Sequence, residues 1–355
     1  MKYLRLRSKI DNWLTYGLII VAYIVMRLLI AGGNISSTLQ GQLVPITAYI
    51  VMAISLNLTV GVLGELSLGH AGFMSVGAFS GVITATLLTD AIPMTWLRLA
   101  LAMLVGGLFA GIFGFLIGIP VLRLQGDYLA IVTLAFGEII KNVVGTIYLG
   151  YDANGIQVSI ENNTLQLGEG GKVILNGPKG ATGITKLSSF NAGFILILIT
   201  LFIVLNLINS KSGRAIKAVR DDKIAAESVG ISIWRYRMMA FVTSATLAGA
   251  AGALYALNYS AVDAGKFDFN KSILILVFVV LGGMGNIRGS IIAATVLTVL
   301  PEVLRAFDEV RMLVYAIILI LVMLVRNNKT LRQLFQKIGI RRRNSLSNNK
   351  EGDET

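Results

Sequence analysis

The residues of this sequence that could act on a solute or a proton lie inside long apolar runs or beside them. Glu138 is in the middle of one run and Lys141 follows three residues later, so both project from one face of a helix. Ionisable groups inside a lipid bilayer are costly, and they usually pair with each other or face water. Glu138 and Lys141 therefore predict an internal ion pair, and Glu138 is also a candidate for contact with a transported solute.

A second group of candidates lies in a stretch of twelve residues, 61–72, that contains four glycines. So many glycines do not suit a continuous helix. A broken segment in a membrane is tolerated only where it is buried in protein or lines a cavity. We expect His70 to be a hydrogen-bonded packing residue, with a proton relay as the alternative, and we take Glu65, Gly69 and His70 as further candidates for a solute pathway.

The residue types and motifs of enzymatic chemistry are missing. The chain has no cysteine, which excludes disulfides, thiolate metal sites and a cysteine nucleophile, and its single histidine excludes a multi-histidine metal centre. It has no G-x-S-x-G, no H-E-x-x-H and no G-x-x-x-x-G-K-[ST] motif. We predict that the chain is not an enzyme and holds no catalytic residue, no metal, no cofactor and no nucleotide site of its own.

Composition predicts an all-α polytopic membrane protein. Of 355 residues, 55% are hydrophobic and 14% are charged, whereas soluble domains have roughly 25% charged residues. A span needs about 20 apolar residues, and the sequence predicts about ten such helices, with eight possible and some short or broken. The candidate runs are 14–32, 40–61, 70–89, 96–120, 127–148, 191–209, 236–258, 272–286, 289–305 and 311–325.

The net charge of +12 sets the orientation. Three basic segments, 1–13, 210–237 and 326–355, carry the excess, and basic residues beside apolar runs are typical of cytoplasmic segments. We therefore predict cytoplasmic termini on either side of a transmembrane domain, 14–325. The tail meets anionic lipid and ends in disorder, and no nucleic acid is needed to explain the charge.

The outward segment 149–190 has a different composition. It is rich in glycine and asparagine, with short alternating stretches. This pattern predicts turns with one or two short strands, which form a small periplasmic cap.

Small residues recur at helical spacing in several runs. The pairs 77/81, 107/111 and 114/118 are G-x-x-x-G motifs, and 245–252 is almost entirely alanine and glycine. Such residues let helix backbones approach closely in lipid, so we predict tight helix packing. A solute path lined by exposed backbone is the alternative.

The inward segment 210–237 contains a possible docking helix. Asp221 or Asp222 can cap a short helix that runs to about Glu227, and Gly230 can end it. We expect this helix to expose its small residues to a groove on a partner. These residues are Ala225, Ala226 and Val229. A solvated basic loop near lipid headgroups is the alternative.

This segment resembles the coupling segment of bacterial ABC-importer permeases, in which a short Glu-Ala-Ala-like helix followed by glycine docks into the ATPase. Here 225–230 reads Ala-Ala-Glu-Ser-Val-Gly, which departs from the strict order. Stretches 64–73 (Gly-Glu-Leu-Ser-Leu-Gly-His-Ala-Gly-Phe), 123–134 (Arg-Leu-Gln-Gly-Asp-Tyr-Leu-Ala-Ile-Val-Thr-Leu) and 281–286 (Leu-Gly-Gly-Met-Gly-Asn) are similar to the branched-chain amino acid permease family. The likeness is collinear over about 40–325 and is greatest to the longer of that family's two permease subunits.

The resemblance implies an inner-membrane permease that imports branched-chain amino acids. It implies a second permease subunit, two ABC ATPases that use ATP, and a periplasmic substrate-binding protein. The residues that it assigns to ATPase coupling are Asp222, Ala225, Ala226, Glu227 and Gly230. A permease for urea or short amides is the alternative within the family, and an ion-coupled secondary transporter that uses Glu138 is the alternative outside it.

Overall fold

The computed structural model describes residues 2–33, 36–124, 126–152, 155–160, 165, 171–304, 313–314, 316–317 and 320. The chain divides into two units, Met1–Thr298 and Val299–Thr355. The elements below belong to the first unit, apart from the end of the last helix.

Seven helices among the described residues are long and apolar enough to cross a membrane. They are α1 (Lys2–Ala31), α2 (Ser37–Asn57) with its continuation η1 (Leu58–Leu63), α3 (His70–Leu87), α4 (Thr95–Val121), α5 (Asp127–Thr146), α6 (Phe190–Asn209) and α9 (Ile233–Ala256). Two further helices, α10 (Phe269–Gly282) and α11 (Ile287–Val303), are shorter than these. Nine of the ten predicted runs thus hold a helix, and the tenth, 311–325, lies mostly outside the described residues.

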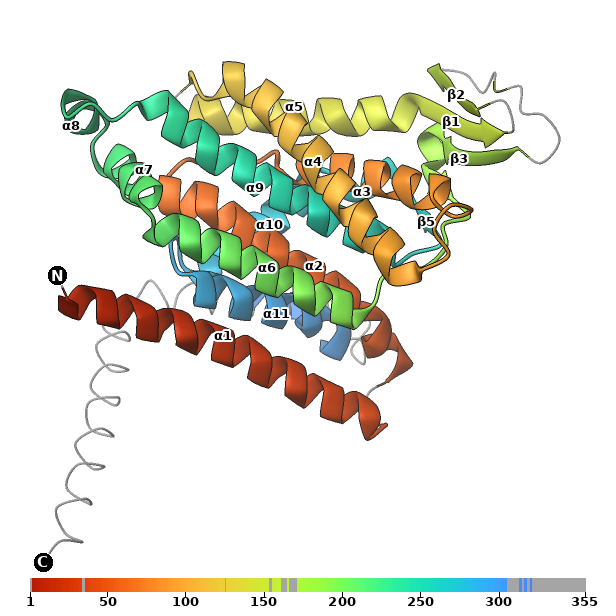
Figure 1. The fold of residues 1–355 in the computed structure, drawn as a ribbon, viewed down its shortest axis with the longest axis horizontal. Helices are drawn as coiled ribbons and strands as arrows, with labels where there is room; N and C mark the ends of the chain where they lie inside the picture. Colours follow the sequence, from red (N-terminus) through yellow and green to blue (C-terminus); the bar gives the residue numbers. More distant parts are fainter. Residues whose placement is uncertain are drawn as a thin grey trace, which may run out of the picture. The chain divides into compact units, whose positions relative to one another are not determined.

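The mostly helical, polytopic fold predicted from composition is confirmed. Helix α2 occupies the centre of the bundle (Figure 1), and every residue from 43 to its end is buried. Its last part, η1, is a π-helix that is also fully buried. The chain is then broken by six residues before α3 begins at His70, as the glycine-rich stretch predicts.

Close backbone contacts hold α3, α4 and α9 together, which confirms the packing prediction. A Cβ atom at Gly77 of α3 would lie 2.1 Å from the carbonyl oxygen of Gly249 in α9. A Cβ atom at Gly249 would lie 2.3 Å from the Cβ of Ala110 in α4. Only glycine permits these approaches, so the three helices form one rigid unit.

The segment predicted to form the outward cap contributes four strands to a five-stranded antiparallel sheet, which has the order β2-β1-β3-β4-β5 among the described residues. The strands of the sheet are β1 (Ile147–Asp152), β2 (Gly155–Ile160), β3 (Lys172–Asn176), β4 (Ala181–Thr182) and β5 (Ala261–Val262). The prediction of one or two strands was therefore wrong. Strands β4 and β5 have two residues each and no readable pattern, because their pairing depends on tertiary contact.

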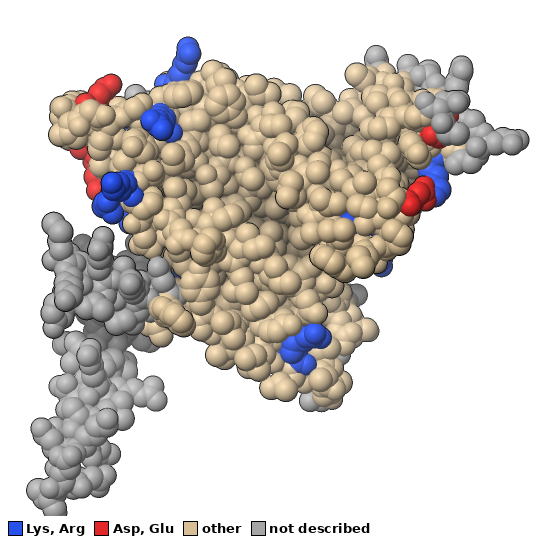
Figure 2. Space-filling model, viewed as in Figure 1, with Lys and Arg blue, Asp and Glu red and all other residues tan. Residues whose placement is uncertain are grey.

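Most charged residues in the view of Figure 2 gather at two opposite edges, and one further basic patch lies over α1. One edge lies over the short helices α7 (Lys211–Asp221) and α8 (Lys223–Ser228), and the other lies over the strands. The surface over α4, α6 and α9 between these edges shows almost no charge. This distribution matches a bundle whose two ends meet water and whose flank meets lipid.

The glycine contacts give the first prediction. Gly77→Ala should lower the free energy of unfolding by about 1–3 kcal/mol, because the methyl group would overlap the backbone of α9. Gly41→Ala is the matched control, since Gly41 is also helical and a Cβ there has nothing within 4 Å. Denaturant titration in detergent measures both variants, and equal loss of stability in the two would contradict the packing assignment.

Candidate functional site

The predicted docking helix exists as α8, and its beginning is fixed by Asp222. The Asp222 side chain is the N-cap, and its Oδ1 accepts a hydrogen bond from the backbone N–H of Ala225 at 3.0 Å. This bond satisfies a donor that the first turn of a helix leaves unpaired. Asp222, one of the two caps predicted from the sequence, therefore sets where α8 starts.

Gly230 ends the helix. Its φ of +82° is in the left-handed region, which L side chains rarely adopt. Two hydrogen bonds close the turn: Ile231 N–H donates to Ala226 C=O at 3.0 Å, and Gly230 N–H donates to Glu227 C=O at 2.9 Å. This is the Schellman arrangement, and it leaves α8 as a compact knob of two turns.

The exposed surface of α8 matches the expectation at Ala225 and Val229 but not at Ala226. Ala226 is only 3% exposed, so the prediction that this residue is exposed to a partner was wrong. Ala225 and Glu227 are exposed, and the most exposed apolar side chains are Ile224 at 83% and Val229 at 74%. The Asp222 cap and the contacts of α8 with α7 and α9 set the helix phase, which composition alone does not give. Ile224 was missed, although an isoleucine in a polar loop is itself a signal.

A buried carboxylate connects α8 to the rest of the bundle. Glu65, in the break between η1 and α3, is 8% exposed and forms an ion pair with Arg237 in α9. The Lys223 ammonium, on the first residue of α8, lies 3.7 Å from the same carboxylate oxygen. Burial raises the pKa of the Glu65 carboxyl, and Arg237 and then Lys223 oppose that rise. Glu65 thus lies where α8, α9 and the broken segment meet.

Two arginines extend this junction. Arg237 donates from Nη1 to Leu122 C=O at 2.5 Å and from Nη2 to Leu124 C=O at 3.0 Å, and so holds the end of α4. Arg220, near the end of α7, donates from Nη1 to Gly61 C=O in η1 at 2.8 Å. The charged side chains of segment 210–237 therefore attach it to η1, to the end of α4 and to the break before α3.

The other candidates from the broken segment lie in the interior. His70 is 2% exposed, and its Nε2 lies 2.8 Å from Ser55 Oγ in α2, as expected for a packing residue. A Cβ atom at Gly69 would lie 2.0 Å from the Thr133 carbonyl oxygen in α5. Hydrogen bonding and close packing account for both positions, and a pathway role for Glu65, Gly69 and His70 stays a prediction.

Glu138 differs from these residues because it reaches the surface of α5. It forms the predicted ion pair with Lys141, and the side chains are 31% and 23% exposed. Its Oε1 also accepts a hydrogen bond from the N–H of Phe269, the first residue of α10, at 3.1 Å. The structure thus brings Glu138 together with Lys141 and α10, but not with Glu65 or His70.

Asn57 is a structural position that the sequence analysis missed. Its Nδ2 donates to Ser290 Oγ of α11 at 2.7 Å, and its Oδ1 accepts from the Gly285 N–H at 2.8 Å. The stretch 281–286 therefore serves as a bend between α10 and α11 that is held against α2. Asn57 carries no motif, so only the fold reveals this role.

Comparison with known proteins assigns the family. Residues 38–323 match the family model described as "Branched-chain amino acid transport system / permease component". The chain belongs to this family. It is 37% identical over 78% of its length to the high-affinity branched-chain amino acid transport system permease protein LivM of Salmonella typhimurium, and it spans 66% of that relative.

The chain is also similar to two relatives of lower identity. The fructose import permease protein FruG of Bifidobacterium longum is 25% identical over 73% of this chain and 72% of its own length. The permease protein LivH of Salmonella typhimurium is 24% identical over 79% of this chain and 89% of its own length. No solved structure gives a significant match. The family and the apolar helices establish a multi-pass inner-membrane protein, as the sequence predicts.

The Glu65 junction gives the second prediction. Glu65→Gln leaves the Arg237 guanidinium buried without its counter-charge, so the free energy of unfolding should fall by on the order of 3 kcal/mol. Lys223→Gln removes only the more distant and partly exposed cation, and should cost less than about 1 kcal/mol. Denaturant titration in detergent compares them, and a Lys223 variant as unstable as the Glu65 variant would rule out this ranking.

Proposed function

We propose that this chain is the permease subunit of an ATP-driven importer of branched-chain amino acids. It pairs with a second permease of the same family, two cytoplasmic ABC ATPases dock on its inward face, and a periplasmic binding protein delivers the solute to its outward cap. ATP is used by the partner subunits. Family membership and the greater identity to LivM than to FruG support the substrate class.

The observation that carries the proposal is the construction of α8. A helix of two turns, fixed at both ends and bearing two exposed apolar side chains, has the form of a knob that fits a groove on another protein. An isolated solvated loop would have no need of the Asp222 cap, the Gly230 turn and the ties through Lys223 and Arg220. Closure of an ATPase pair around such a knob moves a rigid element rather than a loose loop.

The contacts at Glu65 indicate how that movement reaches the bundle. A displacement of α8 acts through Lys223 and Glu65 on Arg237, and so on the ends of α4 and α9. The same displacement acts through Arg220 on η1. In this mechanism the rigid helices switch between two arrangements, and no chemistry occurs in this chain.

An uptake assay tests the substrate and the energy source. Cells that carry the chain with its partner subunits should accumulate labelled leucine, and cells that lack the chain should not. Labelled urea should not accumulate in either strain. Collapse of the proton gradient with ATP retained should leave leucine uptake intact, because Glu138 is held by Lys141 and α10 rather than free to carry a proton. Uptake that stops with the gradient would instead identify a secondary transporter.

Substitution on α8 tests the docking surface. Ile224→Arg and Val229→Arg should each reduce leucine uptake at least about tenfold, because a charge at the centre of an apolar contact is costly to bury. Ile224→Val and Val229→Ile are the matched controls and should transport normally. The amount of protein in the membrane and its melting temperature should be unchanged in all four variants, since both side chains point away from the bundle. Normal uptake by the arginine variants would refute docking at α8.

A further inference from the structure

Two spanning helices, α4 and α6, have exposed sides that are suited to contact with lipid. The exposed residues of α4 from Ala100 to its end are all apolar, and the exposed surface of α6 carries no ionisable residue. Ile112 of α4 is 46% exposed and Ile199 of α6 is 48% exposed. Lipid tails accept such surfaces without loss.

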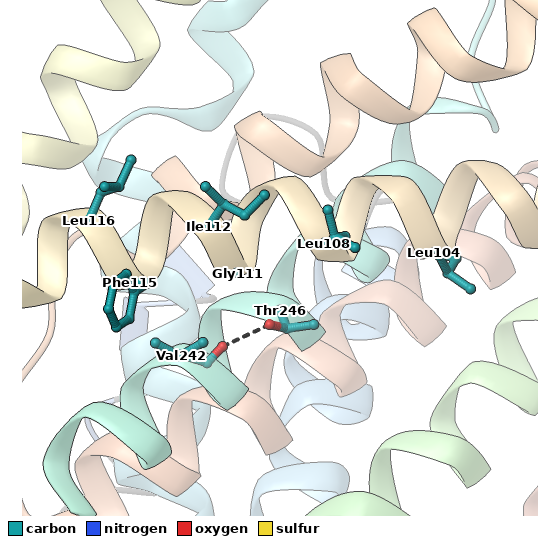
Figure 3. A pocket seen from close by; sticks show the side chains of 8 residues that line it. All are labelled: Leu104, Leu108, Gly111, Ile112, Phe115, Leu116, Val242 and Thr246. Carbon is teal, nitrogen blue, oxygen red and sulfur yellow. Dashed lines mark hydrogen bonds between the residues drawn. The ribbon is translucent and has the colours of Figure 1, made fainter. Parts of the chain in front are cut away.

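A shallow groove of about 600 Å³ between α4 and α9 shows the same character (Figure 3). Its one hydroxyl, on Thr246, donates to the Val242 carbonyl at 2.9 Å and is thereby satisfied within α9. The groove therefore offers no free polar side chain to a protein partner and fits lipid chains. It is lined by Leu104, Leu108, Gly111, Ile112, Phe115, Leu116, Val242 and Thr246.

Helix α5 presents a different surface. Ile131 is 61% exposed and Ile139 is 53% exposed, so no described residue of the chain covers this face. Beside them the charged side chains of Glu138 and Lys141 are partly exposed in the membrane-spanning part of the helix. Charged residues at this depth face protein or water rather than lipid. The α5 surface is thus unsuited to lipid, and its exposed isoleucines suit a protein partner better than water.

Helix α10 adds a second, independent reason. It has 14 residues and so a length of about 21 Å, which is less than the roughly 30 Å of the hydrocarbon layer. Beyond it the chain turns through Gly283 and Gly285, both with positive φ, and Met284 between them is 61% exposed. The backbone of this turn is tied to Asn57 of α2, so the exposure of α10 concerns its side chains, among them Ile273 and Val280. A helix too short to cross the hydrocarbon layer by itself is better covered by protein than by lipid.

The two surfaces are continuous. The N–H of Phe269 at the start of α10 donates to Glu138 of α5 at 3.1 Å. Leu134, Gly137 and Glu138 of α5 line one small cavity together with Asp268 and Phe269. We call the exposed side of α5 and α10, which includes Ile139 and Ile273, the α5–α10 surface.

We propose that the α5–α10 surface is the interface with a second, related permease chain, with the Glu138–Lys141 pair at the seam between the two proteins. The inference rests on the proposed function for the existence of that partner. LivM and LivH, both relatives of this chain, are both named as permease proteins of a branched-chain amino acid transport system, which favours a related chain over a second copy. The surface itself follows from charge, helix length and exposure.

Site-specific photo-cross-linking tests the interface. Benzoylphenylalanine replaces Ile139 or Ile273 in the chain expressed with its partner subunits, and Ile112 or Ile199 in the matched controls, which have similar exposure. After irradiation of membranes, the first two variants should form an adduct that contains peptides of a second permease, as identified by mass spectrometry. The two controls should form none.

A cysteine measurement supports the result if a bulky cross-linker perturbs folding. The chain has no cysteine, so Ile139→Cys and Ile112→Cys each introduce a single thiol. The Ile139→Cys thiol should react with a maleimide more slowly in the purified complex than in the chain purified alone, and the Ile112→Cys thiol should react equally in both.

Three results would overturn the proposal: adducts to a permease from α4 or α6 instead, adducts from α5 and α10 to a second copy of this chain alone, or unprotected Ile139→Cys in the complex. Each of these can occur in cells that import leucine normally, so failure of the interface is distinguishable from failure of the proposed function. Absence of leucine uptake, in contrast, would contradict the proposed function and would leave the proposed interface to be judged by the cross-linking result.

Discussion

A carboxylate enclosed by protein at the edge of a membrane must be neutralised by its neighbours, and Glu65 is such a carboxylate. Its counter-charges come from two elements that are far from it in the sequence, the first residue of α8 and the beginning of α9. Breaking the pair with Arg237 would leave a buried charge uncompensated, whereas Lys223 adds a weaker and partly exposed attraction. These contacts therefore couple the positions of α8, the broken segment before α3 and the end of α4, so that we expect the three to move as one unit.

The remainder of the bundle is built on contact between backbones. Glycines of α3, α4 and α9 bring these helices too close for side chains to slide between them. These contacts make the three helices a rigid unit, because a small shift of one helix against another would make their backbone atoms overlap. A stiff body with charged attachments at its inward end is well suited to transmit a movement over the thickness of a membrane.

Much of this organisation could be predicted from the sequence. Apolar runs gave nine of the helices, G-x-x-x-G spacing gave the tight packing, and the Asp222 and Gly230 signals gave the ends of α8. Helix phase could not be predicted for so short an element, so Ala226 was expected on the surface and Ile224 was overlooked. Strands β4 and β5 and the role of Asn57 also escaped prediction, because each depends on partners that only the folded chain brings near. The ion pair of Glu138 was foreseen from spacing, but its hydrogen bond to α10 was not.

The outward sheet has a mechanical consequence. Strand β1 continues directly from α5, and β5 lies in the connection between α9 and α10. The sheet therefore links the ends of α5, α9 and α10 on its side of the bundle. A protein that binds to the sheet therefore acts on α5, α9 and α10 together. Since α5 and α10 also form the proposed interface, binding at the sheet would act directly on the contact between the two permeases.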